Sequence, residues 1–336
     1  MRTSANDNRA TSTRGSSTQQ RHAGVRPRAG VRARAGAGVR PRAAALALTL
    51  ALVGAATAQT VTVSTARGEA TVKVGPAVVF AYDYGTIDTL HQLGTEVQGA
   101  PPLTGRLPAW APTGAINIGS LFEPDYETVN AEQPDLVVVA GRSAPAYDQL
   151  ARLAPTIDLT SSGDLLADIR RNVTTLAAIV GKPQEGEAAL AGLDAKVAAV
   201  REALAVVEDG MLVMVSGGSL TVVAVDNARA ALLYGVLGVT PTVADVQSAT
   251  HGEPISFEFL LQHDPEWLFV IDRDAAIGTE GAQPAAAVLD NELMHRTTAW
   301  REGHVVYLDP FDWYIVSGTG LGSLNAMLDE LGAALE

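Results

Sequence analysis

The sequence predicts an α/β fold of two similar lobes with mainly parallel sheets, joined by one long helix, with a ligand cleft between the lobes. Short apolar strands alternate with helical segments in both halves, which is typical of α/β layers with parallel sheets. A unit of helix, turn and strand occurs twice, 131 residues apart. Between the copies, residues 182–204 are rich in Ala, Glu and Lys and poor in turn-forming residues, so we expect them to form the joining helix. The expected divisions are 1–58, a leader and signal peptide; 59–181, the N-terminal lobe; 182–207, the linking helix; and 208–336, the C-terminal lobe.

Two matching spacings define the repeated unit. Glu127 and Glu258 each precede a proline by seven residues, and that proline precedes Arg142 and Arg273, respectively, by eight. An apolar stretch that reads as a strand lies between the proline and the arginine in both copies. Agreement of both spacings around the same kind of strand indicates two related α/β lobes.

In the first half, each element follows from a local pattern. Alternating β-branched and polar residues at 61–74, with Arg67-Gly68-Glu69 in the middle, predict a hairpin. An apolar run at 76–82 predicts a buried strand, and Asp83 begins the helix that follows. Residues 99–113 carry four prolines and are expected to be loop. The remaining elements expected here are helices at 123–132, from 146, and at 164–180, and strands at 136–140 and 157–159.

The second half opens with an apolar strand at 211–215, which Gly217-Gly218 closes, and continues with a strand at 220–224. Arg229 begins a helix that ends at Gly238. The remaining elements expected here are helices at 258–263 and 319–335 and strands at 267–271 and 305–308.

Composition excludes several classes of protein. The chain of 336 residues is 47% hydrophobic and has no cysteine, which excludes disulfides, thiolate metal sites and a cysteine nucleophile. The formal net charge is −13, but residues 1–58 hold ten arginines and a single acid, so the remainder is far more acidic. Such a surface repels phosphate backbones, and we expect no nucleic acid as partner.

The N-terminus has the pattern of an export signal. Arg40-Pro41-Arg42 precedes an apolar run, Ala43 to Ala58, that ends in the small-residue pattern Ala56-Thr57-Ala58. The alternative is an uncleaved membrane anchor, although the run is shorter than the roughly 20 residues that span a bilayer. Residues 1–38 are either a mis-assigned start or a disordered extension. We expect a secreted, periplasmic protein without a lipid anchor, because no cysteine follows the run.

The two arginines of the repeat lie just past the ends of predicted strands. In a parallel α/β sheet, ligands bind beyond the carboxyl ends of the strands. A single arginine at such a position is better explained by a helix cap or by an ion pair with a surface acid. Because Arg142 and Arg273 hold equivalent positions in two lobes, we expect both to face one cleft and to bind an anionic ligand.

Several longer motifs resemble those of a known transport family. They are Leu90 to Gly94, Phe122 to Glu127, Gln133 to Leu136, Thr250-His251-Gly252, Ser256-Phe257-Glu258, Val270 to Arg273, Ala276-Ile277-Gly278, Leu289-Asp290-Asn291, and Leu308-Asp309-Pro310 with Trp313-Tyr314. From about Val78 to the C-terminus the chain resembles periplasmic binding proteins for ferric siderophores, of the helix-linked two-lobe class that supplies ABC importers. The likeness is to the branch that binds catecholate siderophores such as petrobactin.

The resemblance implies a ligand site. Arg142, Arg229 and Arg273 match the three pocket arginines of the catecholate branch. His251 and Tyr314 match its iron-ligating histidine and tyrosine. From the residues alone, His251 is better explained as a turn histidine after Thr250, so its role as a ligand comes from the resemblance.

Glu127 and Glu258 begin the helices of the repeated unit, away from the strand ends. The residues leave two interpretations open: a charge favourable at a helix N-terminus, or a pair of exposed carboxylates that dock a basic partner. The resemblance implies the second, because both match the glutamates by which this class docks on its permease.

The implied chemistry is consistent with the residues. Fe³⁺ is a hard cation that accepts phenolate oxygen and tolerates imidazole. A ferric tris-catecholate carries a charge of −3, which three always-charged arginines balance. A bis-catecholate leaves coordination sites that His251 and Tyr314 could fill. Iron is then part of the ligand, and no permanently bound cofactor is expected.

The sequence therefore predicts a monomeric binding protein, not an enzyme, that captures a ferric catecholate-type siderophore and delivers it to an ABC permease of the inner membrane. The alternatives are a binder of ferric citrate, haem or cobalamin, an exported α/β enzyme acting on an anionic substrate, and a Zn²⁺ or Mn²⁺ binder of the same fold. The enzyme would need a nucleophile and base, and the metal binder would need several histidines and carboxylates in the cleft.

Overall fold

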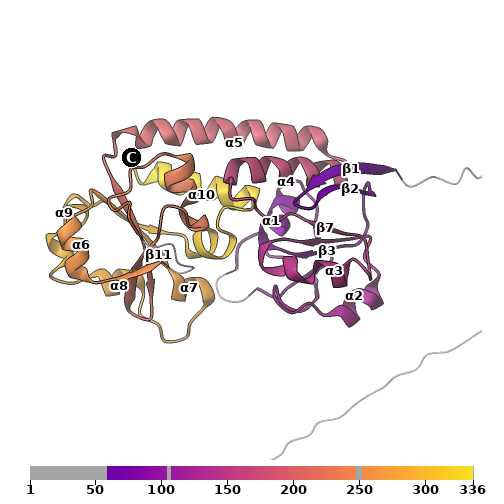
Figure 1. The fold of residues 1–336 in the computed structure, drawn as a ribbon, viewed down its shortest axis with the longest axis horizontal. Coiled ribbons are helices and arrows are strands. Elements are labelled where there is room, and N and C mark those ends of the chain that lie inside the picture. The colour runs from indigo at the N-terminus through magenta and orange to yellow at the C-terminus, as the bar shows by residue number, and fades with distance from the viewer. Residues whose placement is uncertain (1–58, 104–106, 247–251, 336) are drawn as a thin grey trace, which may run out of the picture. The chain divides into compact units, whose positions relative to one another are not determined.

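The computed structural model describes residues 59–103, 107–246 and 252–335, which belong to one compact unit. The predicted signal peptide and the predicted iron ligand His251 lie outside these residues. Among the described helices, none is long and apolar enough to cross a membrane. Figure 1 shows two α/β lobes with the helix α5, Pro183–Ala203, running along one side of both.

The predicted N-terminal hairpin is present and is separate from the two main sheets. Strands β1, Thr60–Thr65, and β2, Gly68–Lys73, pair antiparallel from Thr60 opposite Lys73 to Thr65 opposite Gly68. At the turn, Arg67 donates from Nε to Asp158 at 2.8 Å, and Thr175 of helix α4 donates to the Ser64 carbonyl at 2.8 Å. These contacts fasten the hairpin to the first lobe.

The first lobe is built on a five-stranded parallel sheet in the order β5-β4-β3-β6-β7. Its two central strands, β3 and β6, are buried at every residue, as expected for a parallel sheet covered on both faces. The two-residue strands β4 and β5 were not predicted, because they flank a proline-rich segment that reads as loop. The strands are β3 Val79–Tyr82, β4 Gly99–Ala100, β5 Ile116–Asn117, β6 Leu136–Val139 and β7 Thr156–Asp158; the helices are α1 Tyr84–Gln92, α2 Tyr126–Glu132, α3 Tyr147–Leu150 and α4 Leu165–Ile179.

The second lobe has a mixed sheet in the order β10-β9-β8-β11-β12. Strands β8, β11 and β12 are parallel, as predicted, but β9 and β10 run antiparallel. The reason lies at Gly217-Gly218, where both residues have positive φ (56° and 74°) and close a tight hairpin between β8 and β9. The strands are β8 Gly210–Ser216, β9 Ser219–Val222, β10 Glu253–Ile255, β11 Trp267–Asp272 and β12 Val305–Leu308; the helices are α6 Phe257–His263, α7 Arg273–Ile277, α8 Ala285–Leu289, α9 Thr298–Glu302 and α10 Leu321–Ala333.

The repeat read from the sequence is also a repeat in structure. Helices α2 and α6 both end at a residue in the left-handed conformation, Gln133 with φ 47° and Asp264 with φ 44°. A proline follows in both, and then a buried strand, β6 or β11. In both lobes, therefore, a helix ends abruptly just before the strand that leads to an arginine, Arg142 in one lobe and Arg273 in the other.

The linking helix α5 packs on helices of both lobes. Its buried residues are Gly186, Leu193, Val197 and Val200, and the last three join the apolar core of the second lobe. Near its N-terminus, Gly186 approaches Ala177 of α4 so closely that a Cβ there would overlap the Ala177 methyl group. A linker packed along its length in this way limits the independent motion of the lobes.

The lobes also meet through α1 and the start of α10. A Cβ at Gly85 would lie 2.5 Å from the Thr319 hydroxyl oxygen, and one at Gly320 or Gly322 would overlap the Asp88 carboxylate. Asp88 Oδ2 accepts the Ser323 backbone N–H at 2.8 Å. The glycine-rich run Gly318 to Gly322 therefore serves close packing between the lobes.

Two buried carboxylates accompany this packing. Burial raises the pKa of Asp88 from its ordinary 3.8 to about 6. Burial also raises the pKa of Glu330 on α10 from 4.5 to about 7, although Glu330 accepts hydrogen bonds from the Trp313 indole and the Asp309 backbone, both at 2.8 Å. Both groups hold protons more tightly in the folded protein than in the unfolded chain.

We therefore expect the free energy of unfolding to rise as the pH falls from 7.5 to 5.5. The folded state gains protons at Asp88 and Glu330 over this range, while the unfolded chain gains none there until near pH 4.5. Urea unfolding at the two pH values measures the effect. The control Glu330→Gln keeps an acceptor for Trp313 and should show a smaller pH dependence. If the urea concentration at the midpoint of unfolding were lower at pH 5.5 than at pH 7.5, the raised pKa values of the two carboxylates would be contradicted.

Candidate functional site

A cavity of about 230 Å³ lies between the two lobes, at the carboxyl ends of the central strands of the first sheet. The first lobe contributes residues that follow β3 and β6, and the second contributes the segments around Arg229 and Val316. The lining residues are Tyr82, Asp83, Leu121, Ala140, Gly141, Arg142, Ala228, Arg229, Ile315, Val316, Ser317 and Thr319. The cleft predicted between the lobes is thus present, and two of the three predicted arginines line it.

Arg142 is presented by a turn held against the neighbouring strand. Gly141, with φ 46°, turns the chain after β6, and the buried hydroxyl of Ser143 donates to the Tyr82 carbonyl at 2.8 Å. The Arg142 side chain is exposed, and its Nη1 donates to the Ile315 carbonyl of the second lobe at 3.1 Å. Arg142 therefore bridges the lobes at the cavity.

Tyr314 contacts the other two arginines, Arg229 and Arg273. It lies on a single-turn π-helix, Phe311–Val316, and its phenol oxygen accepts a hydrogen bond from Arg273 Nε at 2.9 Å. The Arg229 guanidinium lies 4.3 Å from the ring centroid and that of Arg273 lies 5.7 Å from it. Both are within cation–π range. The ring thus holds two guanidiniums near the cavity wall.

Arg273 is the first residue of α7, directly after the central strand β11. Its Nη1 contacts the Ser216 hydroxyl at 3.2 Å at the end of the adjacent strand β8, and lies 3.8 Å from Asp274. Its side chain remains 29% exposed, so part of the guanidinium stays open to a ligand.

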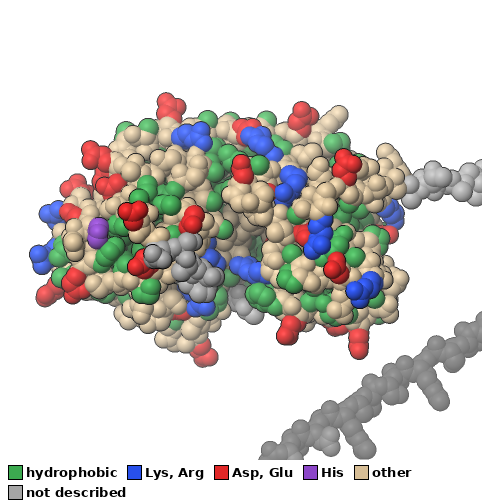
Figure 2. Space-filling model, in the orientation of Figure 1, with side chains coloured by type: hydrophobic (Ala, Val, Ile, Leu, Met, Phe, Trp, Pro, Cys, Tyr) green, Lys and Arg blue, Asp and Glu red, His purple; other side chains and the backbone are tan. Residues whose placement is uncertain are grey.

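The three guanidiniums act on one another. Burial lowers the pKa of Arg229, and the positive charges of Arg142 and Arg273 lower that pKa further. Arginine stays protonated in proteins, so the cost appears as repulsion within the unliganded cleft. On the face shown in Figure 2, a few basic side chains lie at the recess between the lobes, while the rest of the surface carries both acidic and basic side chains. An anion bound in the cleft would relieve this repulsion.

Asp83 is a site residue that the sequence suggests only in part. As predicted, it caps α1, and its Oδ2 accepts the Thr86 N–H at 2.7 Å. It also lines the cavity. The signal was its position: Asp83 directly follows β3, and Arg142 lies three residues after the end of the paired strand β6.

The two glutamates predicted to dock on the permease have simpler surroundings than the arginines. Glu127 and Glu258 are exposed in the first turns of α2 and α6. The Ser256 hydroxyl, which caps α6, lowers the pKa of Glu258, so that carboxylate is charged at neutral pH. Both interpretations, helix charge and docking, fit this geometry, and the docking role stays a prediction.

The iron-binding prediction is described only at Tyr314. The structure places its phenol among the arginines, whereas His251 is outside the described residues. Within residues 59–103, 107–246 and 252–335, no three His, Asp or Glu side chains gather as a metal site would need.

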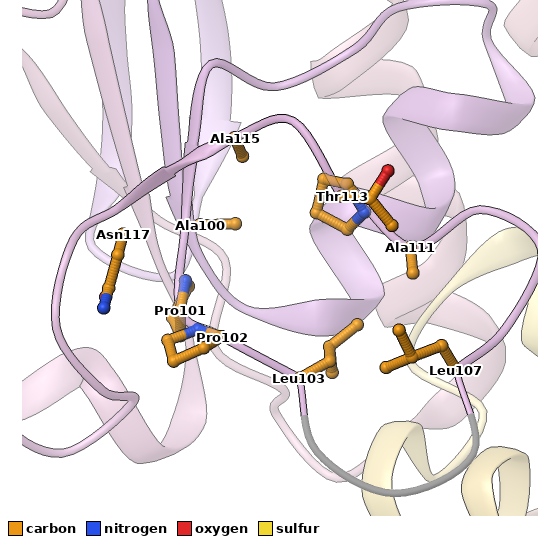
Figure 3. A pocket seen from close by; sticks show the side chains of 10 residues that line it. Ala100, Pro101, Pro102, Leu103, Leu107, Ala111, Thr113, Ala115 and Asn117 are labelled. Atoms are coloured by element: carbon orange, nitrogen blue, oxygen red, sulfur yellow. The ribbon is translucent and has the colours of Figure 1, made fainter. Parts of the chain in front are cut away.

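A larger hollow of about 280 Å³ lies in the first lobe and differs in chemistry. Figure 3 shows it with Leu103 and Leu107 at one end and Asn117 at the other, and with prolines and alanines between them. Among the described residues that line it, none has a charged side chain, so these residues lack the groups that bind an anion. The lining residues are Ala100, Pro101, Pro102, Leu103, Leu107, Ala111, Pro112, Thr113, Ala115 and Asn117.

Comparison with known proteins agrees with this architecture. Residues 79–311 match the model of a family described as periplasmic binding protein. The chain is 32% identical over 267 residues to the petrobactin-binding protein YclQ of Bacillus subtilis, covering 78% of this chain and 83% of that protein.

Two solved structures are also similar. A TroA-like periplasmic binding protein from Xylanimonas cellulosilytica is 42% identical with a TM-score of 0.74, covering 82% of this chain and 98% of that one. The periplasmic catecholate-siderophore binding protein VctP from Vibrio cholerae is 30% identical with a TM-score of 0.73, covering 81% of this chain and 99% of that one.

We expect Arg273→Ala to weaken binding of a ferric catecholate by about tenfold or more, because a hydrogen bond to a charged group contributes roughly 1.5–3 kcal/mol. Fluorescence titration measures the affinity, and thermal unfolding checks the fold. Arg170→Ala is the control, since Arg170 pairs with Asp194 on the far side of α4 and does not line the cleft. Equal affinities of wild type and Arg273→Ala would remove Arg273 from the site.

Proposed function

The chain belongs to the periplasmic binding protein family, and on this premise we propose that it captures a ferric catecholate-type siderophore and delivers it to an ABC permease. The observation that carries the proposal is a cluster of three arginines from separate chain segments: Arg142 and Arg229 line the cleft between the lobes, and Arg273 shares the Tyr314 ring with Arg229. Three guanidiniums match an anionic metal complex far better than a neutral ligand.

The shape of the ligand's donors also supports a catecholate. Catecholate oxygens accept guanidinium hydrogen bonds in their own plane, and catechol rings offer a π-face to a cation. In this chain Arg229 already lies over the Tyr314 ring, at 4.3 Å from its centroid. A bound catechol ring would present a second aromatic face to the same cluster of arginines.

Tyr314 and His251 are the proposed protein ligands to iron, used when the siderophore leaves coordination sites open. The phenol is a hard oxygen donor suited to Fe³⁺. Its phenol oxygen accepts a hydrogen bond from Arg273 Nε at 2.9 Å, which supports this role because the contact fixes the orientation of the donor oxygen beside the arginines. Iron enters and leaves with the siderophore as cargo, and the protein carries out no reaction on it.

We also propose how the protein is exported and how its chain divides into two lobes and a linker. We assign residues 1–58 to a leader and signal peptide that direct a monomer, without a lipid anchor, to the periplasm. We assign 59–181 and 208–336 to the two lobes and 182–207 to the linker. Both lobes then take part in capture and in contact with the permease.

The titration of residues 59–336 with four iron complexes tests the function. Trp313 is fully buried beside Tyr314, so its fluorescence should report on the site. We expect saturable quenching by ferric tris- and bis-catecholates, and none by a ferric hydroxamate or ferric citrate. A visible charge-transfer shift with the bis-catecholate, lost in Tyr314→Phe or His251→Ala, would identify the protein ligands. Binding of citrate alone, or of none of the four, would refute the assignment.

The docking role of Glu127 and Glu258 has its own test. We expect the double substitution to alanine to leave siderophore affinity unchanged, because both side chains are exposed and line no described cavity near the arginines. It should abolish stimulation of the ATPase by the loaded protein when the permease is reconstituted in vesicles. Glu132→Ala with Glu302→Ala, which removes two exposed helix-end glutamates, is the control. Full stimulation by the Glu127/Glu258 variant would leave these residues as helix charges only.

A further inference from the structure

A second, smaller cavity adjoins the arginine cleft. It has a volume of about 80 Å³ and lies between the ends of β6 and β7 and helix α4. The two cavities share the wall residues Asp83, Ala140, Gly141 and Thr319. The smaller one has room for roughly three water-sized groups, so it can receive a short arm of a ligand that sits in the cleft.

Most polar groups of the small cavity already have protein partners. The Asp168 carboxylate accepts the Ser161 hydroxyl at 2.5 Å and the Ser162 N–H at 2.7 Å, and pairs with Arg171 at 2.8 Å. The Asn172 amide donates to the Leu159 carbonyl at 3.2 Å and accepts from Arg171 at 3.1 Å. Asp168 Oδ1 accepts no hydrogen bond within the described residues, but its charge is paired with the Arg171 guanidinium, so a cationic ligand group would gain little there.

Asp83 differs from them. Both hydrogen bonds that cap α1, from the Thr86 N–H at 2.7 Å and the Thr86 hydroxyl at 2.9 Å, end on the same oxygen, Oδ2. Within the described residues, no group donates a hydrogen bond to Oδ1. Asp83 lines both cavities, so this oxygen stands at the passage from one to the other.

Helix capping alone does not explain why a carboxylate occupies position 83. Asn, Ser and Thr cap helices as well as Asp does, or nearly so, without a charge. A negative charge in a cleft that binds an anion repels the ligand, and burial makes the charge more expensive, as the raised pKa of Asp83 shows. The nearby Arg142 favours the charged form of Asp83 but donates its hydrogen bond to the Ile315 carbonyl instead.

We infer that Asp83 binds a protonated amine in the arm that joins the iron-chelating groups of the siderophore. The arginines take the anionic ferric centre, and the amine reaches the mouth of the small cavity. This inference rests on the proposed function and narrows its substrate class. The preferred ligand has catecholates joined by an amine-bearing linker, and the same chelating groups on a linker without an amine bind less well.

Two synthetic ligands test the inference. Both are bis-catecholates with linear linkers of equal length, one with a secondary amine at its centre and the other with a methylene there. We expect wild-type protein to bind the ferric complex of the amine ligand about tenfold more tightly, as for one charge-assisted hydrogen bond. Asp83→Asn should bind the two complexes equally, because it keeps the cap and loses the charge.

Asp164→Asn is the matched control. Asp164 caps α4 through the Ala167 N–H at 3.0 Å, is exposed and lines neither cavity, so its loss of charge should leave the tenfold preference intact. Asp83→Ser, a second capping residue, replaces Asp83→Asn if thermal unfolding shows that the latter is not folded. If the Asp83 variant still prefers the amine ligand, or if wild-type protein binds both ferric complexes equally, the inference is overturned. Failure of both complexes to bind wild-type protein overturns the proposed function instead.

Discussion

Helix α1 of the first lobe lies against the start of α10 of the second so closely that no methyl group fits between them. Glycines at 85, 320 and 322 make this approach possible, and the Asp88 carboxylate receives a backbone N–H across it. Because α1 follows β3 and α10 follows the π-helix of Tyr314, this contact fixes where the two halves of the site lie. The geometry of the arginine cleft depends on it more than on any contact within the cleft.

In the site that this contact positions, three positively charged arginines lie close together. Aromatic and carbonyl groups hold the arginines in place: the Tyr314 ring and phenol for Arg229 and Arg273, and the Ile315 carbonyl for Arg142. The ring, the phenol and the carbonyl are uncharged, and the acidic neighbour Asp274 lies 3.8 Å from Arg273. The site is thus organised before a ligand arrives, and an anionic complex finds donors whose orientation is already set, which reduces the entropy lost on binding.

Much of the fold could be read from the sequence, because strands and helices leave periodic patterns. The hairpin, the central strands and the linking helix are confirmed, and the spacing between Glu127, Pro134 and Arg142 identified the repeat of helix, stop and strand. The strand predicted at 220–224 is present as β9; its antiparallel direction was not predicted, although Gly217-Gly218 carried the hairpin signal. Strands of two residues, such as β4, are too short to leave a pattern.

The site was less accessible to local reasoning. Arg142 and Arg273 could be placed by the rule that ligands bind beyond strand ends, but Arg229 and Tyr314 came from the family resemblance alone. Tyr314 and Arg273 are 41 residues apart, and no local pattern shows that they touch. The second role of Asp83, beside its cap, appears only when two cavities are seen to share it.

The contact between α1 and α10 has a consequence for the order in which the protein is made. Chains are synthesised from the N-terminus, and domains fold as they emerge. Helix α1 is among the first elements to emerge and α10 is the last. The first lobe can therefore assemble early, but the face of α1 that carries Gly85 stays uncovered until the final helix arrives. A chain that lacks its last helix would hold both sheets and all three arginines but not the contact that positions the two lobes, so the geometry of the cleft is set only once α10 has been made.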